Sequence, residues 1–145
     1  MRLTVLDASA LLRFLDAEPG ADRVEQLLLQ CAAGQVILLM AAVNWGECIS
    51  ALVRHNGMDA ANEVIDRLSS LRLTIEPCGA HEAEETAFLK EKFKIPYADA
   101  FAAALAKNED ALLVTADYDF KKLPQGLIKI DFLPVKTKKS HSPHK

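Results

Sequence analysis

The segment LTVLDASALL, residues 3–12, contains the junction that decides the fold. Residues 2–6 form a short apolar run of the kind that makes a buried strand. A helical pattern begins near Ala8, with Leu11 and Leu15 on one face, and Asp7 lies between the two elements. A strand that passes directly into a helix is typical of the β–α–β units of α/β proteins.

The rest of the chain repeats this alternation. Apolar runs predict strands at 35–40, 71–77, 111–115 and 127–133, and helical patterns predict helices between a break at 18–20 and residue 34 and at 42–56, 59–70, 80–93 and 97–108. Strands that alternate with single helices or helix pairs predict a mostly parallel sheet with helices on both faces. We expect one domain, residues 1–134, followed by a basic tail, residues 135–145, whose composition is typical of disorder.

The composition is that of an ordinary globular domain, with 50% hydrophobic and 26% charged residues. The longest apolar runs, such as residues 36–43, are too short to span a bilayer, and Asp7 interrupts any signal-peptide core. The three cysteines are widely spaced and form no CxxC pair, which favours free thiols over a zinc site. We therefore expect a cytoplasmic protein without a membrane segment.

Charge is distributed unevenly along the chain. Residues 1–89 carry six arginines, no lysine and thirteen acids, a net charge of −7, whereas residues 90–145 carry eleven lysines and seven acids, a net charge of +4. The total of −3 lacks the global basic footprint of a strong nucleic-acid binder. The lysines of the second part could draw a polyanion toward an acidic site, or they could simply be solvated on helix faces and in the tail.

Four acidic residues occupy the edges of apolar segments. Asp7 and Asp117 directly follow predicted strands, whereas Glu47 and Asp99 lie in helical stretches rich in small residues. The carboxyl ends of parallel strands share one edge, where ligands of such sheets bind. Carboxylates that meet there repel each other unless a divalent cation neutralises them, and oxygen-only ligation suits Mg²⁺ or Mn²⁺. The order of these segments therefore predicts metal-dependent phosphodiester chemistry.

Each acid also has an ordinary structural explanation. Asp7 could be the N-cap of the helix that follows it, and Asp117 could form an Asx turn. Asp99 could serve only to complement a helix dipole, and Glu47 could pair with Arg54 on the same helix face. These explanations apply to each acid separately and do not account for the occurrence of all four in this order.

Taken together, four short motifs resemble those of PIN-domain ribonucleases, most like the VapC toxins of bacterial VapBC toxin–antitoxin pairs. They are VLDASALL (5–12), the helix that carries Asn44-Trp45-Gly46-Glu47, YADAFAAALA (97–106) and LLVTADYDF (112–120), so the resemblance extends over residues 1–134. It implies a metal-binding and catalytic quartet of Asp7, Glu47, Asp99 and Asp117, with Asp119 as an auxiliary acid and Ser9 and Thr115 as hydroxyls that support the carboxylates.

The resemblance also implies a reaction and partners. PIN-domain ribonucleases hydrolyse RNA with one or two Mg²⁺ or Mn²⁺ ions and leave a 3′-hydroxyl and a 5′-phosphate, so water attacks and no side-chain nucleophile is needed. VapC toxins usually form homodimers and are held inactive by a VapB antitoxin, whose N-terminal domain binds operator DNA. We therefore expect a toxin that meets DNA only through its antitoxin. Candidate contacts to RNA are Tyr97, Tyr118, Phe120 and Lys121.

Two other interpretations are weighed against this one. A haloacid-dehalogenase phosphatase needs a D-x-D motif after the first strand, where this chain has Asp7-Ala8-Ser9, and a response-regulator receiver needs an acidic pair and a phosphoacceptor at positions where this chain has neither. A PIN fold kept as a protein-binding module, with weak or no nuclease activity, is disfavoured by the intact quartet. Metal titration separates such a module from the enzyme.

Overall fold

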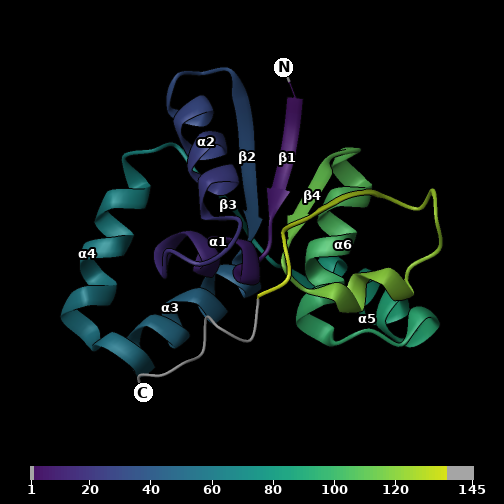
Figure 1. Cartoon of the computed structure of the whole chain (residues 1–145). Helices are drawn as coiled ribbons and strands as arrows, with labels where there is room; N and C mark the ends of the chain where they lie inside the picture. Colours follow the sequence, from purple (N-terminus) through teal and green to yellow (C-terminus); the bar gives the residue numbers. More distant parts are fainter. Residues whose placement is uncertain (1, 137–145) are drawn as a thin grey trace.

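The computed structural model describes residues 2–136, and within them the chain forms a five-stranded sheet in which every neighbouring pair of strands is parallel. The strands are β1 (Arg2–Leu6), β2 (Val36–Ala41), β3 (Thr74–Glu76), β4 (Leu112–Thr115) and β5 (Lys129–Phe132), and their order is β3-β2-β1-β4-β5. The predicted α/β fold is therefore confirmed (Figure 1). The strand order reverses between β1 and β4, and such a switch point is where open parallel sheets bind their ligands.

Most helices agree with the sequence patterns. They are α1 (Ala8–Leu15), α2 (Ala21–Ala32), α3 (Ala42–Asn56), α4 (Met58–Ser69), α5 (Ala80–Phe93) and α6 (Tyr97–Glu109), and a short 3₁₀ helix, η1 (Tyr118–Lys122), was not predicted. Three of the observed strands, β3, β4 and β5, are shorter than the strands predicted at 71–77, 111–115 and 127–133. The strand predicted at 71–77 begins only at Thr74, because Arg72 takes a positive φ of 64° in the turn that closes α4.

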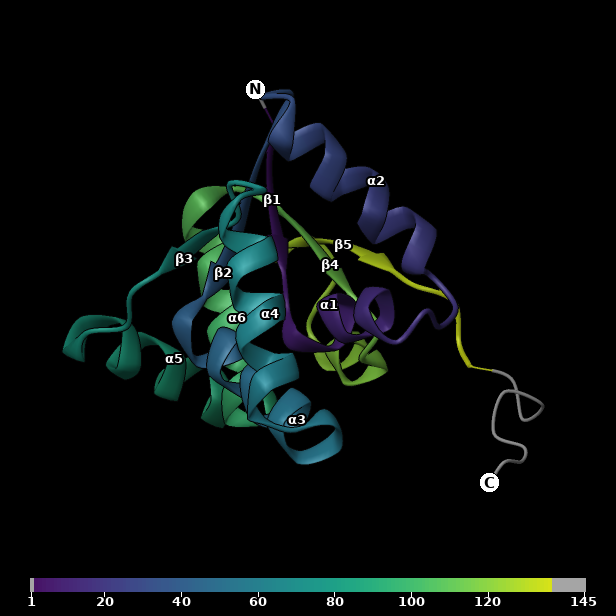
Figure 2. The same cartoon turned by 90° about the vertical axis from the view of Figure 1, so that its left-hand side faces the viewer.

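The strands divide their side chains between two hydrophobic cores. In β2, Leu38 and Met40 pack into a core formed with α1, α2, α3 and α4, whereas Leu39 packs on the other face against α6. This alternation follows from the two-residue period of a strand, and strands buried on both faces are expected in a parallel sheet. Figures 1 and 2 show α2 and α6 on opposite sides of the sheet, so the prediction of helices on both faces is confirmed.

Helix α3 joins the two layers at the carboxyl edge of the sheet. It begins directly after β2 and contacts both α1 and α6 (Figure 1). It ends at Asn56, where Gly57 has a φ of 90° that a residue with a Cβ rarely adopts, as the Asn56-Gly57 pair predicted. The acidic residue of this helix, Glu47, is thereby held near the start of α6.

The segment that follows β5 is fixed to the α1 side of the molecule. The guanidinium of Arg13, which is buried, donates hydrogen bonds to the carbonyl oxygens of Pro19 (2.6 Å) and Pro134 (2.7 Å). Lys136 forms an ion pair of 2.9 Å with Glu18. The predicted basic tail begins at residue 135, and its residues 137–145 lie outside the described part of the chain.

Cys31 and Cys48 are buried free thiols and Cys78 is an exposed one. All three are therefore free thiols, as predicted. Along residues 2–136, each helix is too short or too polar to cross a lipid bilayer.

Candidate metal centre

Asp7 is a buried carboxylate at the junction of β1 and α1, with only 3% of its surface exposed. It is the N-cap of α1, since its Oδ1 accepts a hydrogen bond of 3.0 Å from the backbone N–H of Ala10. Burial raises its pKa to about 6, although hydrogen bonds from Thr115, Ala10 and Ser9 oppose that rise. The capping explanation is therefore correct, but capping alone gives no reason to bury a carboxylate so deeply.

Two hydroxyl groups connect Asp7 to the end of β4. Ser9 donates to Oδ1 of Asp7 (2.8 Å) and accepts a hydrogen bond from the N–H of Ala116 (2.9 Å). Thr115 donates to Oδ2 of Asp7 (2.5 Å) and accepts one from the N–H of Asp117 (2.9 Å). Each hydroxyl thus uses its proton on the carboxylate and a lone pair on the backbone of the neighbouring strand. The arrangement holds the ends of β1 and β4 together at the switch point.

Asp117 lies directly before η1, the short helix that contains Asp119. Its Oδ1 accepts a hydrogen bond of 2.9 Å from the N–H of Asp119, which is the geometry of an Asx turn and caps η1. One oxygen of each of Asp99, Asp117 and Asp119 lies within 4.8 Å of the others. The Asx-turn explanation is therefore correct, and the turn also brings Asp117 and Asp119 to Asp99.

Asp99 lies in the first turn of α6, where the backbone N–H groups favour negative charge. It is half-buried, and its Oδ2 is inaccessible to solvent and has no hydrogen-bond partner among the described residues. Burial, and then the adjacent carboxylates of Asp117, Asp7 and Asp119, raise the pKa of Asp99 to about 8. A buried oxygen without a partner costs free energy unless a ligand satisfies it.

Glu47 lies in α3, and the side-chain amide of a neighbouring residue orients its carboxylate. The side-chain amide of Asn44, which is 1% exposed, donates to Oε1 of Glu47 (3.1 Å) and to the carbonyl oxygen of Ala98 (3.1 Å). This amide links α3 to the first turn of α6, one residue before Asp99. Asn44 was not among the predicted site residues, although a polar residue three positions before Glu47 in a largely apolar helix was a usable signal.

The predicted quartet lines one depression of about 370 Å³ at the carboxyl edge of the sheet, together with Asn44, Ser50, Arg54 and the small side chains of α1 and α3. Asp119 belongs to the three-carboxylate group but does not line the depression. The guanidinium of Arg54 donates to the hydroxyl of Ser50 (3.4 Å), and within residues 2–136 it forms no ion pair with Glu47. The explanation that Glu47 pairs with Arg54 on the same face of its helix is therefore wrong.

The donor set fits a hard divalent cation. The acidic side chains that line the depression are all carboxylates, and among residues 2–136 no thiol or imidazole lines it, which is the chemistry that Mg²⁺ or Mn²⁺ prefers. Two buried oxygens are available without a partner in the described chain, Oδ2 of Asp99 and Oδ1 of Asn44. A bound cation would satisfy these oxygens and offset the negative charge of the neighbouring carboxylates.

One suggested contact to RNA is wrong. Phe120 is fully buried in the core between α6 and the sheet, because the 3₁₀ turn directs it inward. Tyr97 and Tyr118 are 41% and 36% exposed, and Lys121 is exposed. These three side chains remain accessible beside the acidic residues.

The fold is shared with solved structures of toxin–antitoxin proteins. VapBC2 from Rickettsia felis, bound to a DNA fragment from its promoter, matches with a TM-score of 0.69 and 16% identity over 91% of this chain and 99% of that chain. VapC20 from Mycobacterium tuberculosis, a sarcin-ricin loop cleaving toxin, matches with a TM-score of 0.66 and 17% identity over 81% and 92%. FitAcB from Neisseria gonorrhoeae matches with a TM-score of 0.62 and 19% identity over 88% and 95%. At these identities the likeness shows the fold alone.

The sequence itself identifies the family. No curated protein sequence matches the chain. The family model for the PIN domain matches residues 4–126, which include the acidic quartet, Asp119, Ser9 and Thr115. The match covers most of the chain and agrees with the resemblance and with the parallel sheet, and the chain therefore belongs to the PIN domain family.

Proposed function

We propose that this protein is a Mg²⁺- or Mn²⁺-dependent endoribonuclease that acts as the toxin of a toxin–antitoxin pair. The observation that carries the metal-dependent activity is the three-carboxylate group of Asp99, Asp117 and Asp119, in which Oδ2 of Asp99 is buried without a partner. A carboxylate that was only a helix cap would turn both oxygens to N–H groups or to solvent.

Asp7, Asp99 and Asp117, which line the depression with Glu47, would hold the metal, with Asp119 as an auxiliary acid. Oδ1 of Asp7 already accepts hydrogen bonds from Ser9 and Ala10, whereas Oδ2 accepts one, from Thr115. An ionised carboxylate has about four acceptor sites, two on each oxygen. The oxygen of Asp7 with capacity left for a cation is therefore Oδ2. Asn44 would hold Glu47 in place, as partners of metal ligands commonly do.

When bound, Mg²⁺ or Mn²⁺ supplies positive charge that offsets the charge developing on the cleaved phosphodiester and acidifies the attacking water. The residues of the chain position this charge. The histidines at positions 55 and 81 are not placed to act as general bases at this site. His55 and His81 are exposed and do not line the depression. Arg54 is the one cationic side chain among the described residues that line it, and its guanidinium can bind a phosphate oxygen of the substrate.

Two kinds of similarity support the toxin role. The quoted motifs resemble those of VapC proteins, and solved structures of VapBC complexes from Rickettsia felis and Salmonella typhimurium share the fold. We infer that an antitoxin covers the acidic site and mediates operator binding, and that the toxin forms a homodimer. Val24 and Leu27 of α2 and Leu68 of α4 are buried in the core, whereas Leu29 of α2 and Met58 of α4 are exposed and accessible to a partner.

The test is cleavage by the purified chain of total tRNA and of ribosomal RNA, with Mg²⁺, with Mn²⁺ and with EDTA, beside Asp99→Asn. Discrete cuts that require metal and disappear in the variant are expected. Asp110→Asn is the matched control, because Asp110 is exposed at the far end of α6 and has a positive φ of 51°, which Asn tolerates well. A chain that neither cuts RNA nor binds Mn²⁺ would instead be a protein-binding module.

A further inference from the structure

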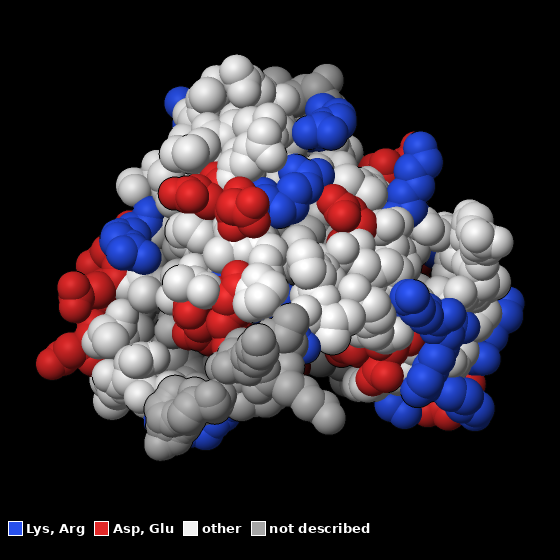
Figure 3. Space-filling model, viewed as in Figure 1, with Lys and Arg blue, Asp and Glu red and all other residues white. Residues whose placement is uncertain are grey.

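Five of the eight lysines among residues 2–136 lie in α5, the turn that follows it and η1. Lys90, Lys92 and Lys94 lie at the C-terminal end of α5 and in the turn that leads to α6, and Lys121 and Lys122 lie in η1. We call these five residues the lysine patch. Figure 3 shows Lys and Arg side chains gathered over the region that α5 and the segment after β4 occupy in Figure 1.

The two halves of the lysine patch are in contact and border the three-carboxylate group. The ammonium of Lys122 lies 3.5 Å from the carbonyl oxygen of Lys94, which joins η1 to the α5–α6 turn. Lys121 and Lys122 follow Asp119 in η1, and the α5–α6 turn leads into the first turn of α6, which contains Asp99. The lysine patch therefore lies next to the candidate metal centre, on one side of it.

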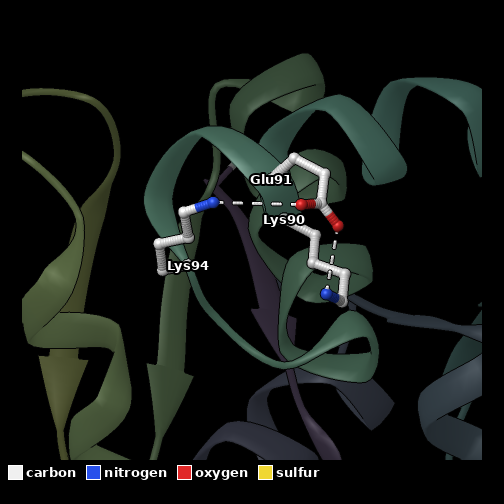
Figure 4. Close-up of polar contacts among 3 residues, drawn as sticks. All are labelled: Lys90, Glu91 and Lys94. Atoms are coloured by element: carbon white, nitrogen blue, oxygen red, sulfur yellow. Dashed lines mark hydrogen bonds and ion pairs between the residues drawn. The ribbon is translucent and has the colours of Figure 1, made fainter.

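Internal contacts leave most of this positive charge available. Lys121 is held over the rings of Tyr118 (5.1 Å) and Phe132 (5.5 Å), which orients its ammonium without neutralising it. Glu91 is the one acid that pairs with the patch among the described residues, with Lys90 at 3.2 Å and Lys94 at 3.9 Å (Figure 4). Both pairs are exposed, and such pairs bind weakly and are readily exchanged for another anion.

We propose that the lysine patch binds the sugar–phosphate backbone of single-stranded RNA on one side of the scissile phosphate, an inference that rests on the proposed nuclease function. An acidic metal centre repels a polyanion, so adjacent cationic side chains are needed to hold the strand against it. Ammonium groups on flexible side chains contact phosphates without reading sequence.

The experiment measures the binding of a fluorescent, mixed-sequence single-stranded RNA in EDTA, where no cleavage competes, by anisotropy over a range of KCl concentrations. For single strands, each phosphate contact contributes about 0.7 to the slope of log K against log salt, which is about fivefold in affinity between 0.1 M and 1 M salt. The double variant Lys94→Gln/Lys122→Gln should therefore bind about 25-fold more weakly at 0.1 M salt, with a slope lower by about 1.4.

Matched variants separate local charge from net charge. Lys107→Gln/Lys129→Gln makes the same change in net charge at exposed positions near the end of α6 and at the start of β5, on the opposite edge of the sheet, and should leave affinity within about twofold. Glu91→Gln should tighten binding, because it removes the acid that competes for Lys90 and Lys94, whereas Glu109→Gln should not.

The proposal would be overturned if both double variants lost RNA affinity equally, or if Lys94→Gln/Lys122→Gln bound RNA as the wild type does. It would also be overturned if the wild-type chain bound no RNA. The binding assay needs neither metal nor turnover, so it fails independently of the nuclease. Loss of cleavage with patch-dependent binding intact would remove the proposed function alone. Normal RNA binding together with normal cleavage by Lys94→Gln/Lys122→Gln would reject the role of the lysine patch and leave the proposed nuclease function standing.

Discussion

The hydroxyl of Thr115 donates a hydrogen bond of 2.5 Å to Oδ2 of Asp7, although 108 positions separate these residues in the chain. This contact joins the ends of β1 and β4, the two strands between which the strand order reverses. It also partly offsets the rise in the pKa of Asp7 that burial causes. One buried hydroxyl thus serves both the fold and the charge state of the candidate metal centre.

Thr115→Val should destabilise the protein by about 2 kcal/mol and weaken Mn²⁺ binding, because it removes the donor to Oδ2 of Asp7 and the acceptor of the Asp117 N–H. Denaturant unfolding and isothermal titration with Mn²⁺ measure the two effects. Thr86→Val is the matched control, since the hydroxyl of Thr86 is buried and bonds to nothing within residues 2–136. It should be neutral or stabilising, and an equal loss in both variants would contradict a specific role for Thr115.

Asp99→Asn should abolish cleavage and the stabilisation by Mn²⁺, while the metal-free protein should become more stable. The substitution removes a carboxyl group whose ionisation is opposed by burial and by Asp117, Asp7 and Asp119, and it removes the anionic ligand that we assign to the metal. The melting temperature with and without millimolar Mn²⁺ reports both effects, because a ligand of the native state raises it by mass action. A variant that melts as the wild type does and still responds to Mn²⁺ would exclude Asp99 from the site.

The metal-free protein should lose stability as the pH rises from about 4 to about 8. The pKa values of Asp7 and Asp99 are raised from 3.8 to about 6 and about 8 in the folded state. The folded protein therefore binds more protons than the unfolded chain in this interval, and stability falls as those protons are lost. For Asp7, a shift of about two units at 1.36 kcal/mol per unit is a loss on the order of 3 kcal/mol.

Urea unfolding at a series of pH values in EDTA tests this dependence. Saturating Mn²⁺ should reverse its sign above pH 6, because the ion binds the ionised carboxylates. The slope should be shallower in Asp99→Asn and unchanged in Asp110→Asn. Stability that rises steadily from pH 4 to pH 8 in EDTA would show that neither carboxyl has a raised pKa.

Asn44→Ala should weaken Mn²⁺ binding about 10- to 100-fold, the range found when a partner of a metal ligand is removed. The substitution frees Glu47 and leaves the carbonyl oxygen of Ala98 without its donor. Ser50→Ala is the control, because Ser50 lines the same depression, is exposed and bonds only to Arg54 among the described residues. Mn²⁺ titration of both variants checks the expectation, and similar affinities would leave Asn44 with a structural role only.

Gly20→Ala should cost more stability than Gly126→Ala, by about 1–2 kcal/mol. Both glycines have a positive φ, 95° and 92°, so the backbone strain is comparable. A Cβ at position 20 would lie 2.9 Å from Cβ of Leu133, whereas one at position 126 meets nothing within 4 Å. Thermal unfolding of the two variants measures the difference, which should vanish if the segment after β5 is not fixed against α1.

The sequence by itself determined the fold class and most element boundaries. Apolar runs, helical spacing and the Asn56-Gly57 stop are local signals, so the predicted helices at 42–56 and 80–93 match α3 and α5 to the residue. The order of the acidic motifs was equally local and led to the PIN domain family. Local signals were weakest where a turn altered the pattern, as at Arg72 and in η1.

Only the tertiary structure showed where the acids lie relative to one another. In sequence, Asp7, Asp99 and Asp117 could each be explained as a cap or a turn, and the structure shows those local roles and places all three side chains around one depression. The partners that distinguish the site, such as Thr115 for Asp7 and the carbonyl of Ala98 for Asn44, come from distant parts of the chain. Burial and mutual repulsion depend on such long-range neighbours, and a pattern of nearby residues does not contain them.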